Sequence, residues 1–206
     1  MIKKISIYLV SFSLFLVSIN AAFAAINNDP LKLLESVSAK IVTELKSNKA
    51  TLKSNPNKVY SIAYKYVVPN ADITVMSQRV LPPNIWQRAT ASEKLKFKTE
   101  FTKLLVKTYA GALSDYTSQT IKFHPIRGGF NGKSRVKVSS QIIRSDGPPI
   151  AVVYSLLKEP SGWKLYDMSV EGVSLLESFR SQFQSKLSQG NMKNLIGDLQ
   201  KHNARI

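Results

Sequence analysis

One stretch, residues 163–187, constrains the fold more than any other part of the chain. Its first part, 163–170, alternates bulky apolar with smaller or polar side chains and is rich in aromatic and β-branched residues, which predicts a strand. Gly172 follows and can adopt backbone angles that other residues avoid, so we expect a sharp turn. Ser174 and Glu177 have the spacing of a capping box, which starts a helix. Apolar residues recur every four positions along one face of that helix: Leu175, Phe179, Phe183 and Leu187.

The rest of the chain predicts helices before this stretch and strands leading into it. Asp29-Pro30 and Asn55-Pro56 are typical helix starts, and a longer helix is expected from Thr90 or Ser92 to about Ser114. Four strands are expected, at 120–124, 135–143, 150–157 and 163–170, and short turns join them. Helices followed by a meander of strands and then helices predict an α+β fold with an antiparallel four-stranded sheet.

The first 24 residues have the features of a secretory signal peptide. Lys3 and Lys4 precede an uncharged apolar run, and Ala22-Phe23-Ala24 is a small-x-small cleavage site. We therefore expect cleavage after Ala24, a periplasmic location, and a single domain over residues 25–206. The chain contains no cysteine, which excludes disulfides, thiolate metal sites and a lipid anchor on cysteine.

Residues capable of catalysis or metal binding are few. His124 and His202 are isolated, so no metal site is predicted. The loop 127–134 resembles a phosphate-binding loop but precedes a predicted strand, so we interpret it as a hairpin loop. Asp167 and Glu171 are the one carboxylate pair with suggestive spacing. We expect Glu171 to occupy the strand-to-helix corner and Asp167 to pair with a lysine or arginine.

The chain has a net charge of +16. Nucleic acid is the usual partner of such a protein, but export removes it, so no nucleic-acid binding is expected. Two interpretations remain open. Lys96, Lys103 and Lys107, which we expect to point away from the apolar face of the long helix, could contact acidic surfaces or anionic head groups. Alternatively, these lysines are simply solvated.

Several short segments, taken in order, resemble the MlaC (toluene-tolerance) family. The strongest lie in the central stretch: Trp163, residues 166–168, residues 171–174, Arg180 and Phe183. Residues 86–90, residues 108–110 and Tyr154 add to the resemblance. Pro82-Pro83 departs from the family pattern, which usually has a glycine and an aromatic residue there.

This resemblance implies a periplasmic phospholipid carrier, not an enzyme. It further implies a nuclear-transport-factor-like cone, in which helices cover the concave face of the curved sheet and enclose an apolar lipid cavity. The carrier would be a monomer without a cofactor, its bound phospholipid being cargo. It would shuttle lipid between an inner-membrane ABC-transporter complex and an outer-membrane lipoprotein–porin complex, maintaining outer-membrane lipid asymmetry. The predicted cavity wall consists of nine residues: Phe101, Leu105, Tyr109, Val152, Tyr154, Met168, Val170, Leu176 and Phe179.

Two other classes of function remain open from the sequence. The first is an enzyme of the same cone fold acting on a hydrophobic substrate, which would need a polar group deep in the cavity; Asp167 is the candidate. The second is a periplasmic adaptor that docks through its basic face and carries no ligand. Extraction of bound lipid distinguishes these classes from a carrier.

Overall fold

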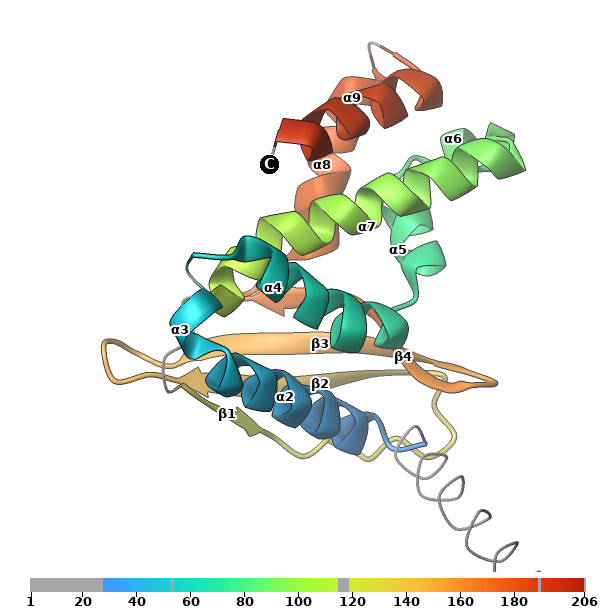
Figure 1. Ribbon diagram of the computed structural model, residues 1–206. Coiled ribbons are helices and arrows are strands. Elements are labelled where there is room, and N and C mark those ends of the chain that lie inside the picture. Colours follow the sequence, from blue (N-terminus) through green and yellow to red (C-terminus); the bar gives the residue numbers. More distant parts are fainter. Residues whose placement is uncertain (1–27, 53, 115–118, 189, 206) are drawn as a thin grey trace, which may run out of the picture.

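The structure is a computed structural model that describes residues 28–52, 54–114, 119–188 and 190–205 (Figure 1). The predicted signal peptide and its cleavage site lie outside the described residues. Six α-helices and two short helical turns come first: α2 (Pro30–Ser47), α3 (Lys49–Leu52), α4 (Pro56–Ile62), a π turn (Ala63–Val67), a 3-10 turn (Val68–Asn70), α5 (Ile73–Val80), α6 (Pro83–Arg88) and α7 (Ala91–Ser114). Five strands and two helices follow: β1 (Thr120–Phe123), β2 (Arg135–Ile143), β3 (Ile150–Glu159), β4 (Gly162–Val170), β5 (Val173–Ser174), α8 (Leu175–Leu187) and α9 (Met192–Arg205).

The structure confirms the predicted starts of three helices. Asp29 accepts a hydrogen bond from the backbone N–H of Leu31 at 2.9 Å, with Pro30 in the first turn of α2. Before α7, Thr90 and Glu93 form a reciprocal capping box. Glu93 Oε2 accepts a hydrogen bond from the Thr90 N–H at 2.9 Å, and Thr90 Oγ1 accepts one from the Glu93 N–H at 3.2 Å. Ser174 caps α8 in the same way as predicted, accepting from the N–H three residues later. Helix α6 was not predicted; it begins at Pro83, whose ring suits the first helical position.

The sheet confirms the α+β prediction but has five strands, not four. Its order is β1-β2-β3-β4-β5, and every neighbouring pair is antiparallel. The additional strand arises because Glu171 (φ 50°) and Gly172 (φ 83°) form a tight turn, so that Val173 pairs back onto Val170. A two-residue strand is too short to produce an alternating pattern, so the sequence did not indicate it. The conical curvature implied by the resemblance stays a prediction.

A β-bulge interrupts the pairing of β3 with β4. Leu156 pairs with Leu165 and Ser155 with Asp167, which leaves Tyr166 as the additional residue on β4. The bulge reverses the alternation of side chains along β4. The guanidinium of Arg79 lies over the Tyr166 ring, 4.4 Å from its centroid.

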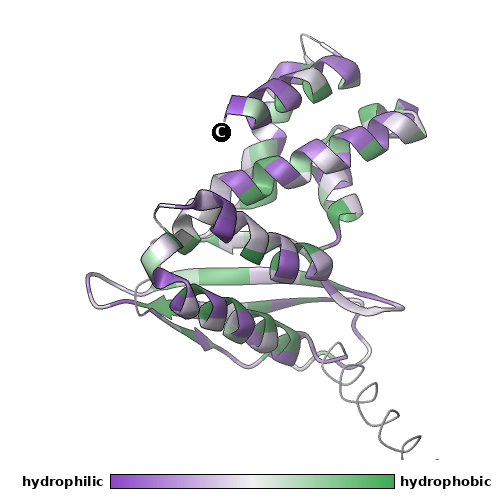
Figure 2. Ribbon diagram, in the orientation of Figure 1, coloured by the Kyte–Doolittle hydropathy of each residue, from purple (hydrophilic) through white to green (hydrophobic). Residues whose placement is uncertain are grey.

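Among the described residues, buried apolar side chains form three separate clusters. The sheet cluster lies between α2 and the sheet: Leu33, Leu34, Val136, Val138, Leu156 and Trp163. The helical cluster lies among α5, α7, α8 and α9 and includes Met76, Val80, Phe97, Phe101, Leu176, Phe179, Phe183 and Leu199. A third cluster joins α2, α3 and α4: Leu45, Leu52, Val59 and Ile62. In Figure 1 the sheet and α2 form the lower part of the molecule, and α5–α9 form the upper part. Figure 2 shows that β3 is largely hydrophobic along its length, whereas α7 and α9 alternate in hydropathy.

The segment before α5 connects the two parts. The Asp72 N–H donates to the carbonyl of Leu165 on β4 at 2.8 Å, and Ala71 forms a parallel bridge with the same residue. Lys164 Nζ donates to the carbonyl of Pro69 at 2.7 Å. The helical part is therefore fastened to β4 by backbone and side-chain hydrogen bonds.

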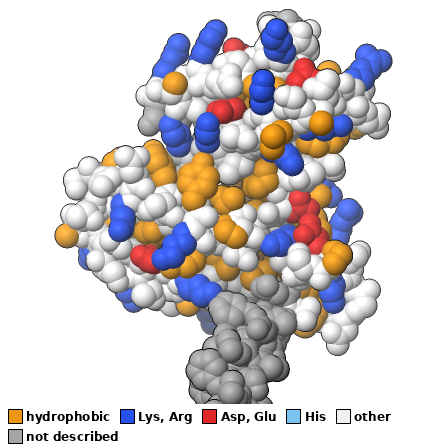
Figure 3. Space-filling view, turned by 45° about the vertical axis from the view of Figure 1, so that its right-hand side comes forward, with side chains coloured by type: hydrophobic (Ala, Val, Ile, Leu, Met, Phe, Trp, Pro, Cys, Tyr) orange, Lys and Arg blue, Asp and Glu red, His pale blue; other side chains and the backbone are white. Residues whose placement is uncertain are grey.

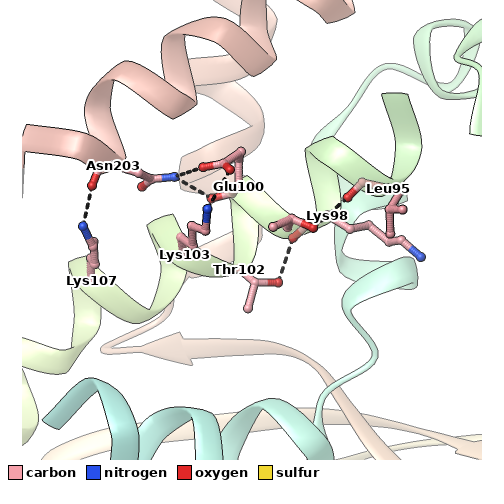
Figure 4. Close-up of polar contacts among 8 residues, drawn as sticks. Leu95, Lys98, Glu100, Thr102, Lys103, Lys107 and Asn203 are labelled. Carbon is pink, nitrogen blue, oxygen red and sulfur yellow. Dashed lines mark hydrogen bonds and ion pairs between the residues drawn. The ribbon is translucent and has the colours of Figure 1, made fainter. Parts of the chain in front are cut away.

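A polar network joins α9 to α7 (Figure 4). Asn203 Nδ2 donates to the carbonyl oxygen of Glu100 at 3.0 Å and to its Oε2 at 2.8 Å, while Lys103 Nζ contacts Glu100 Oε1 at 2.8 Å. Lys107 Nζ donates to the carbonyl of Asn203. Two of the three lysines expected to form an open basic face, Lys103 and Lys107, are therefore half-buried and bound to groups of the protein, whereas Lys96 is exposed.

Over the part of the chain that the structure describes, no helix is both long enough and apolar enough to cross a membrane.

Candidate functional site

The structure divides the nine predicted wall residues by burial. Four are buried: Phe101, Leu176 and Phe179 belong to the helical cluster, and Val152 on β3 is 2 % exposed. The other five are only half-buried: Leu105, Tyr109, Tyr154, Met168 and Val170. Five apolar or aromatic side chains at intermediate burial, drawn from α7, β3 and β4, therefore lie between a filled core and solvent.

On the helical side, a series of aromatic contacts leads from the core to Tyr109. The rings of Phe97 and Phe101 stack with centroids 5.6 Å apart, and Phe101 meets Phe179 edge-on at 5.5 Å. Phe179 in turn meets Tyr109 edge-on at 6.2 Å. Burial raises the pKa of Tyr109. Leu105 lies one helical turn before Tyr109 on the same face, and both pack against the margin of the helical cluster.

On the sheet side, the half-buried residues lie on the face that α2 covers further along. Tyr154 pairs with Val138 on β2, a fully buried member of the sheet cluster, and with Met168 on β4. Burial raises the pKa of Tyr154, whose ring lies 5.8 Å from that of Phe123. Val170, two residues after Met168, shares this face.

Met168 and Val170 belong to none of the three clusters among the described residues. We call the five half-buried residues, Leu105, Tyr109, Tyr154, Met168 and Val170, the interlayer surface. Figure 3 shows hydrophobic side chains gathered at the waist between the upper, helical part and the lower part that contains the sheet. The interlayer surface carries two tyrosine hydroxyls and no charged group, so its chemistry suits contact with hydrocarbon.

Two hollows lie elsewhere on the protein. One of about 860 Å³ is found beside β2, and one of about 330 Å³ lies between α2 and β1. None of the nine predicted wall residues lines either of them. Tyr154 nevertheless lies near the smaller hollow, because its neighbour Phe123 lines it.

Asp167, the candidate acid of the enzymatic alternative, has a structural role. Its Oδ2 accepts a hydrogen bond from Ser174 Oγ at 2.8 Å, and its Oδ1 accepts from the backbone N–H groups of Met168 (2.8 Å) and Leu176 (3.3 Å). The expected pairing with a lysine or arginine was wrong: its partners are the N–H of the next residue on β4 and two donors at the start of α8. Glu171 lies at the predicted corner and exchanges backbone and side-chain hydrogen bonds with Ala151.

One aromatic residue near the waist was missed from the sequence. Tyr64, on the π turn, is 42 % exposed, yet partial burial of its hydroxyl raises its pKa. The charges of Lys103 and Glu100 also act on this hydroxyl, which places the π turn beside the middle of α7. Tyr64 is exposed beside the buried Ile62 and Ala63, so no pattern of apolar residues singled it out.

The family and its relatives match most of the chain. The family model of the MlaC protein matches residues 35–201. The toluene tolerance protein ttg2D of Pseudomonas putida is 27 % identical over 154 residues, covering 75 % of this chain and 71 % of the relative. The intermembrane phospholipid transport system binding protein MlaC of Haemophilus influenzae is 27 % identical over 181 residues, covering 86 % of this chain and 83 % of the relative.

A solved structure matches in three dimensions as well. The phospholipid-binding protein of Ralstonia solanacearum, in complex with a phospholipid, superposes with a TM-score of 0.79 and 29 % identity. The match covers 86 % of this chain and 98 % of that one, so it extends over both the sheet and the helical part. The model match, the two curated relatives and the solved structure agree with the resemblance found in the sequence, and the chain belongs to the MlaC family.

Proposed function

We propose that this protein is a phospholipid carrier, in which the acyl chains lie against the interlayer surface while the head group stays in water. The observation that carries the proposal is the incomplete burial of Met168 and Val170. Both are half-buried on the face of β4 that continues from Tyr154 on β3, yet neither belongs to a packed cluster among the described residues. Hydrocarbon from a ligand would complete this packing. The phospholipid in the Ralstonia solanacearum structure supports the assignment of the ligand class.

The energetics explain why a carrier is needed. Burying each methylene of a lipid contributes about 0.8 kcal/mol, so free diffusion of a diacyl lipid through water is negligible. A half-buried apolar surface lowers this barrier by covering the chains during transit. The same energy makes spontaneous release slow, so a receiving complex has to offer the chains a competing apolar path.

The proposed route runs through the periplasm between two membrane complexes. The carrier would exchange lipid with an inner-membrane ABC-transporter complex and an outer-membrane lipoprotein–porin complex, and so maintain lipid asymmetry in the outer membrane. Support comes from the export signal in the sequence and from the printed name of the Haemophilus influenzae relative, an intermembrane transport system binding protein.

Lipid extraction tests the proposal against both alternatives. Purified protein is extracted with chloroform, and the extract is analysed by mass spectrometry against a protein of similar charge purified identically. We expect intact phospholipid at about one molecule per chain. An empty extract would instead support the ligand-free adaptor. Lysophospholipid or fatty acid that accumulates with incubation time would support the enzyme.

A further inference from the structure

Strand β1 ends early and leaves part of the edge of β2 without a neighbour. β1 pairs only with residues 140–143 of β2, and the last hydrogen bond runs from the His124 N–H to the Ser139 carbonyl at 2.9 Å. The next residue is Pro125, which has no N–H to continue the ladder. No strand among the described residues pairs with the edge of β2 from Arg135 to Lys137.

The backbone of this segment presents hydrogen-bonding groups to the open edge. Successive residues of an antiparallel strand direct their N–H and C=O groups to opposite sides. The Ser134 carbonyl accepts from the N–H of Lys158 on β3, whereas the Ser139 carbonyl faces β1 and accepts from His124. Arg135 and Lys137 have the same parity as Ser139, so their N–H and C=O groups point away from β3 into the open edge.

A basic hollow of about 860 Å³ borders this edge. It forms because the chain after β1 swings away from β2 and packs Ile126 and Phe130 against the sheet cluster. Four cationic side chains line the hollow, and no acidic residue does: Arg127, Lys133, Arg135 and Lys137. Lys133 Nζ is bound to the carbonyls of Gly128 and Gly129, but none of these cations forms an ion pair with a described acidic residue.

We propose that this edge binds an extended, acidic segment of a partner protein, which adds to the sheet as a strand beside residues 135–137. An added strand would use the free N–H and C=O groups of Arg135 and Lys137. Its alternate side chains would lie opposite the two cationic side chains, so acidic residues at every second position fit best. A simple anion would bind the cationic side chains but leave the backbone N–H and C=O groups of the β2 edge without partners. This surface is distinct from the interlayer surface, and the inference does not depend on lipid binding.

A short peptide tests the proposal directly. The probe is a seven-residue peptide with glutamate at alternate positions, valine between them and both termini blocked. We expect it to slow the hydrogen exchange of the Arg135 and Lys137 amides, measured by NMR. The amides of Val136 and Val138, which face β3, serve as internal references and should not change. If the peptide slows exchange of other amides but not those of Arg135 and Lys137, it does not add to this edge.

Charge reversal provides a second measurement. The double variant R135E/K137E should weaken binding of the labelled peptide by at least about tenfold in fluorescence anisotropy. The matched control K193E/K201E changes the net charge equally on exposed positions of α9 and should keep the affinity. Circular dichroism establishes that both variants fold. Equal losses in the two variants would mean that only the overall charge matters, which would contradict the proposal.

Two further probes act on the unaltered protein, so they decide the matter even if a variant misfolds. A peptide of the same sequence, N-methylated on every backbone nitrogen, keeps its charge but cannot pair as a strand along either edge. We expect its binding to be lost; equal binding would overturn strand addition. Vesicles containing anionic phospholipid form the last arm. If they protect these amides and the peptide does not, the surface docks on membranes and the proposal is wrong.

Discussion

Asn203, two residues before the last described residue of α9, donates from its side-chain amide to Glu100 twice, to the backbone carbonyl at 3.0 Å and to the carboxylate at 2.8 Å. Both residues are buried, with Glu100 only 7 % exposed. Burial by itself would raise the pKa of Glu100, but hydrogen bonds from Lys103 and Asn203 outweigh it and hold that pKa below its usual range. The contact therefore joins two helices through a carboxylate that is charged in the folded state.

Replacing Asn203 with alanine should destabilise the protein by about 1–3 kcal/mol, because a buried carboxylate and a buried carbonyl each lose a donor. Urea unfolding at neutral pH measures this loss. Since the pKa of Glu100 is lowered on folding, its contribution is present above the unfolded pKa and is lost as the pH falls through the folded pKa. The difference between wild type and Asn203→Ala should therefore shrink in acid. A difference that is constant with pH would contradict this account.

Lys107 and Lys96 lie on the same helix but should respond differently to charge reversal. Lys107→Glu would place a carboxylate against the carbonyl of Asn203 that Lys107 now binds, so we expect a loss of roughly 1–3 kcal/mol in the free energy of unfolding. Lys96→Glu changes an exposed residue and should leave the stability within about 0.5 kcal/mol of wild type. Equal stabilities in urea would show that the Lys107 contact is unimportant. Lys96→Glu is also the variant suited to testing a basic docking face.

Met168 and Val152 provide a matched pair for the interlayer surface. Val152 is 2 % exposed, so Val152→Glu should unfold the domain or cost several kcal/mol, because an unpaired carboxyl group would be buried. Met168 is half-buried, so Met168→Glu should stay folded while copurifying with much less phospholipid. Circular dichroism and lipid extraction on the same samples give both readings. A folded Met168→Glu protein with full lipid content would remove Met168 from the site.

Glu159 lies beside Asp72, and the two carboxyl groups interact unfavourably when both are charged. A hydrogen bond with Asp72 raises the pKa of Glu159 above its usual value, and burial adds to the effect. A raised folded-state pKa means that the contribution to stability is complete below the unfolded pKa and is lost as the pH rises through the folded pKa.

Glu159→Gln should therefore raise the thermal midpoint at pH 7, and the gain should disappear in acid, below the usual carboxyl pKa of about 4.5. Glu35→Gln removes an exposed carboxylate from α2 and serves as the control. A gain that persists unchanged at acidic pH would assign the effect to something other than the Asp72–Glu159 interaction.

Capping residues close together in the sequence predicted where helices begin. Contacts between residues far apart in the sequence could not be predicted. The caps at Asp29, Thr90 and Ser174 depend on residues within three positions of one another, so the sequence contains the whole interaction. Helical spacing correctly separated Lys107 from the apolar face of its helix. It could not indicate that Asn203, 96 residues further along, would lie there to accept its hydrogen bond.

The candidate site was only partly predictable for a similar reason. Alternation along β3 and β4 indicates which side chains share a face, and Val152 and Met168 do so. Both are apolar, and alternation does not tell whether a neighbouring helix fills the space above each one. Their different burial depends on how helices such as α8, which contacts β4, pack above the sheet, and this is a property of the assembled fold.

If the protein is the carrier proposed above, the incomplete packing of Met168 and Val170 makes its lipid-free state the less stable one. If a lipid completes the packing of these residues, its binding stabilises the folded chain by mass action, by about 2.7 kcal/mol when the lipid is at a hundred times its dissociation constant. Delivery of the lipid removes this stabilisation. The carrier on its return journey would then be more susceptible to proteolysis and aggregation, so its abundance in the cell would follow the supply of lipid.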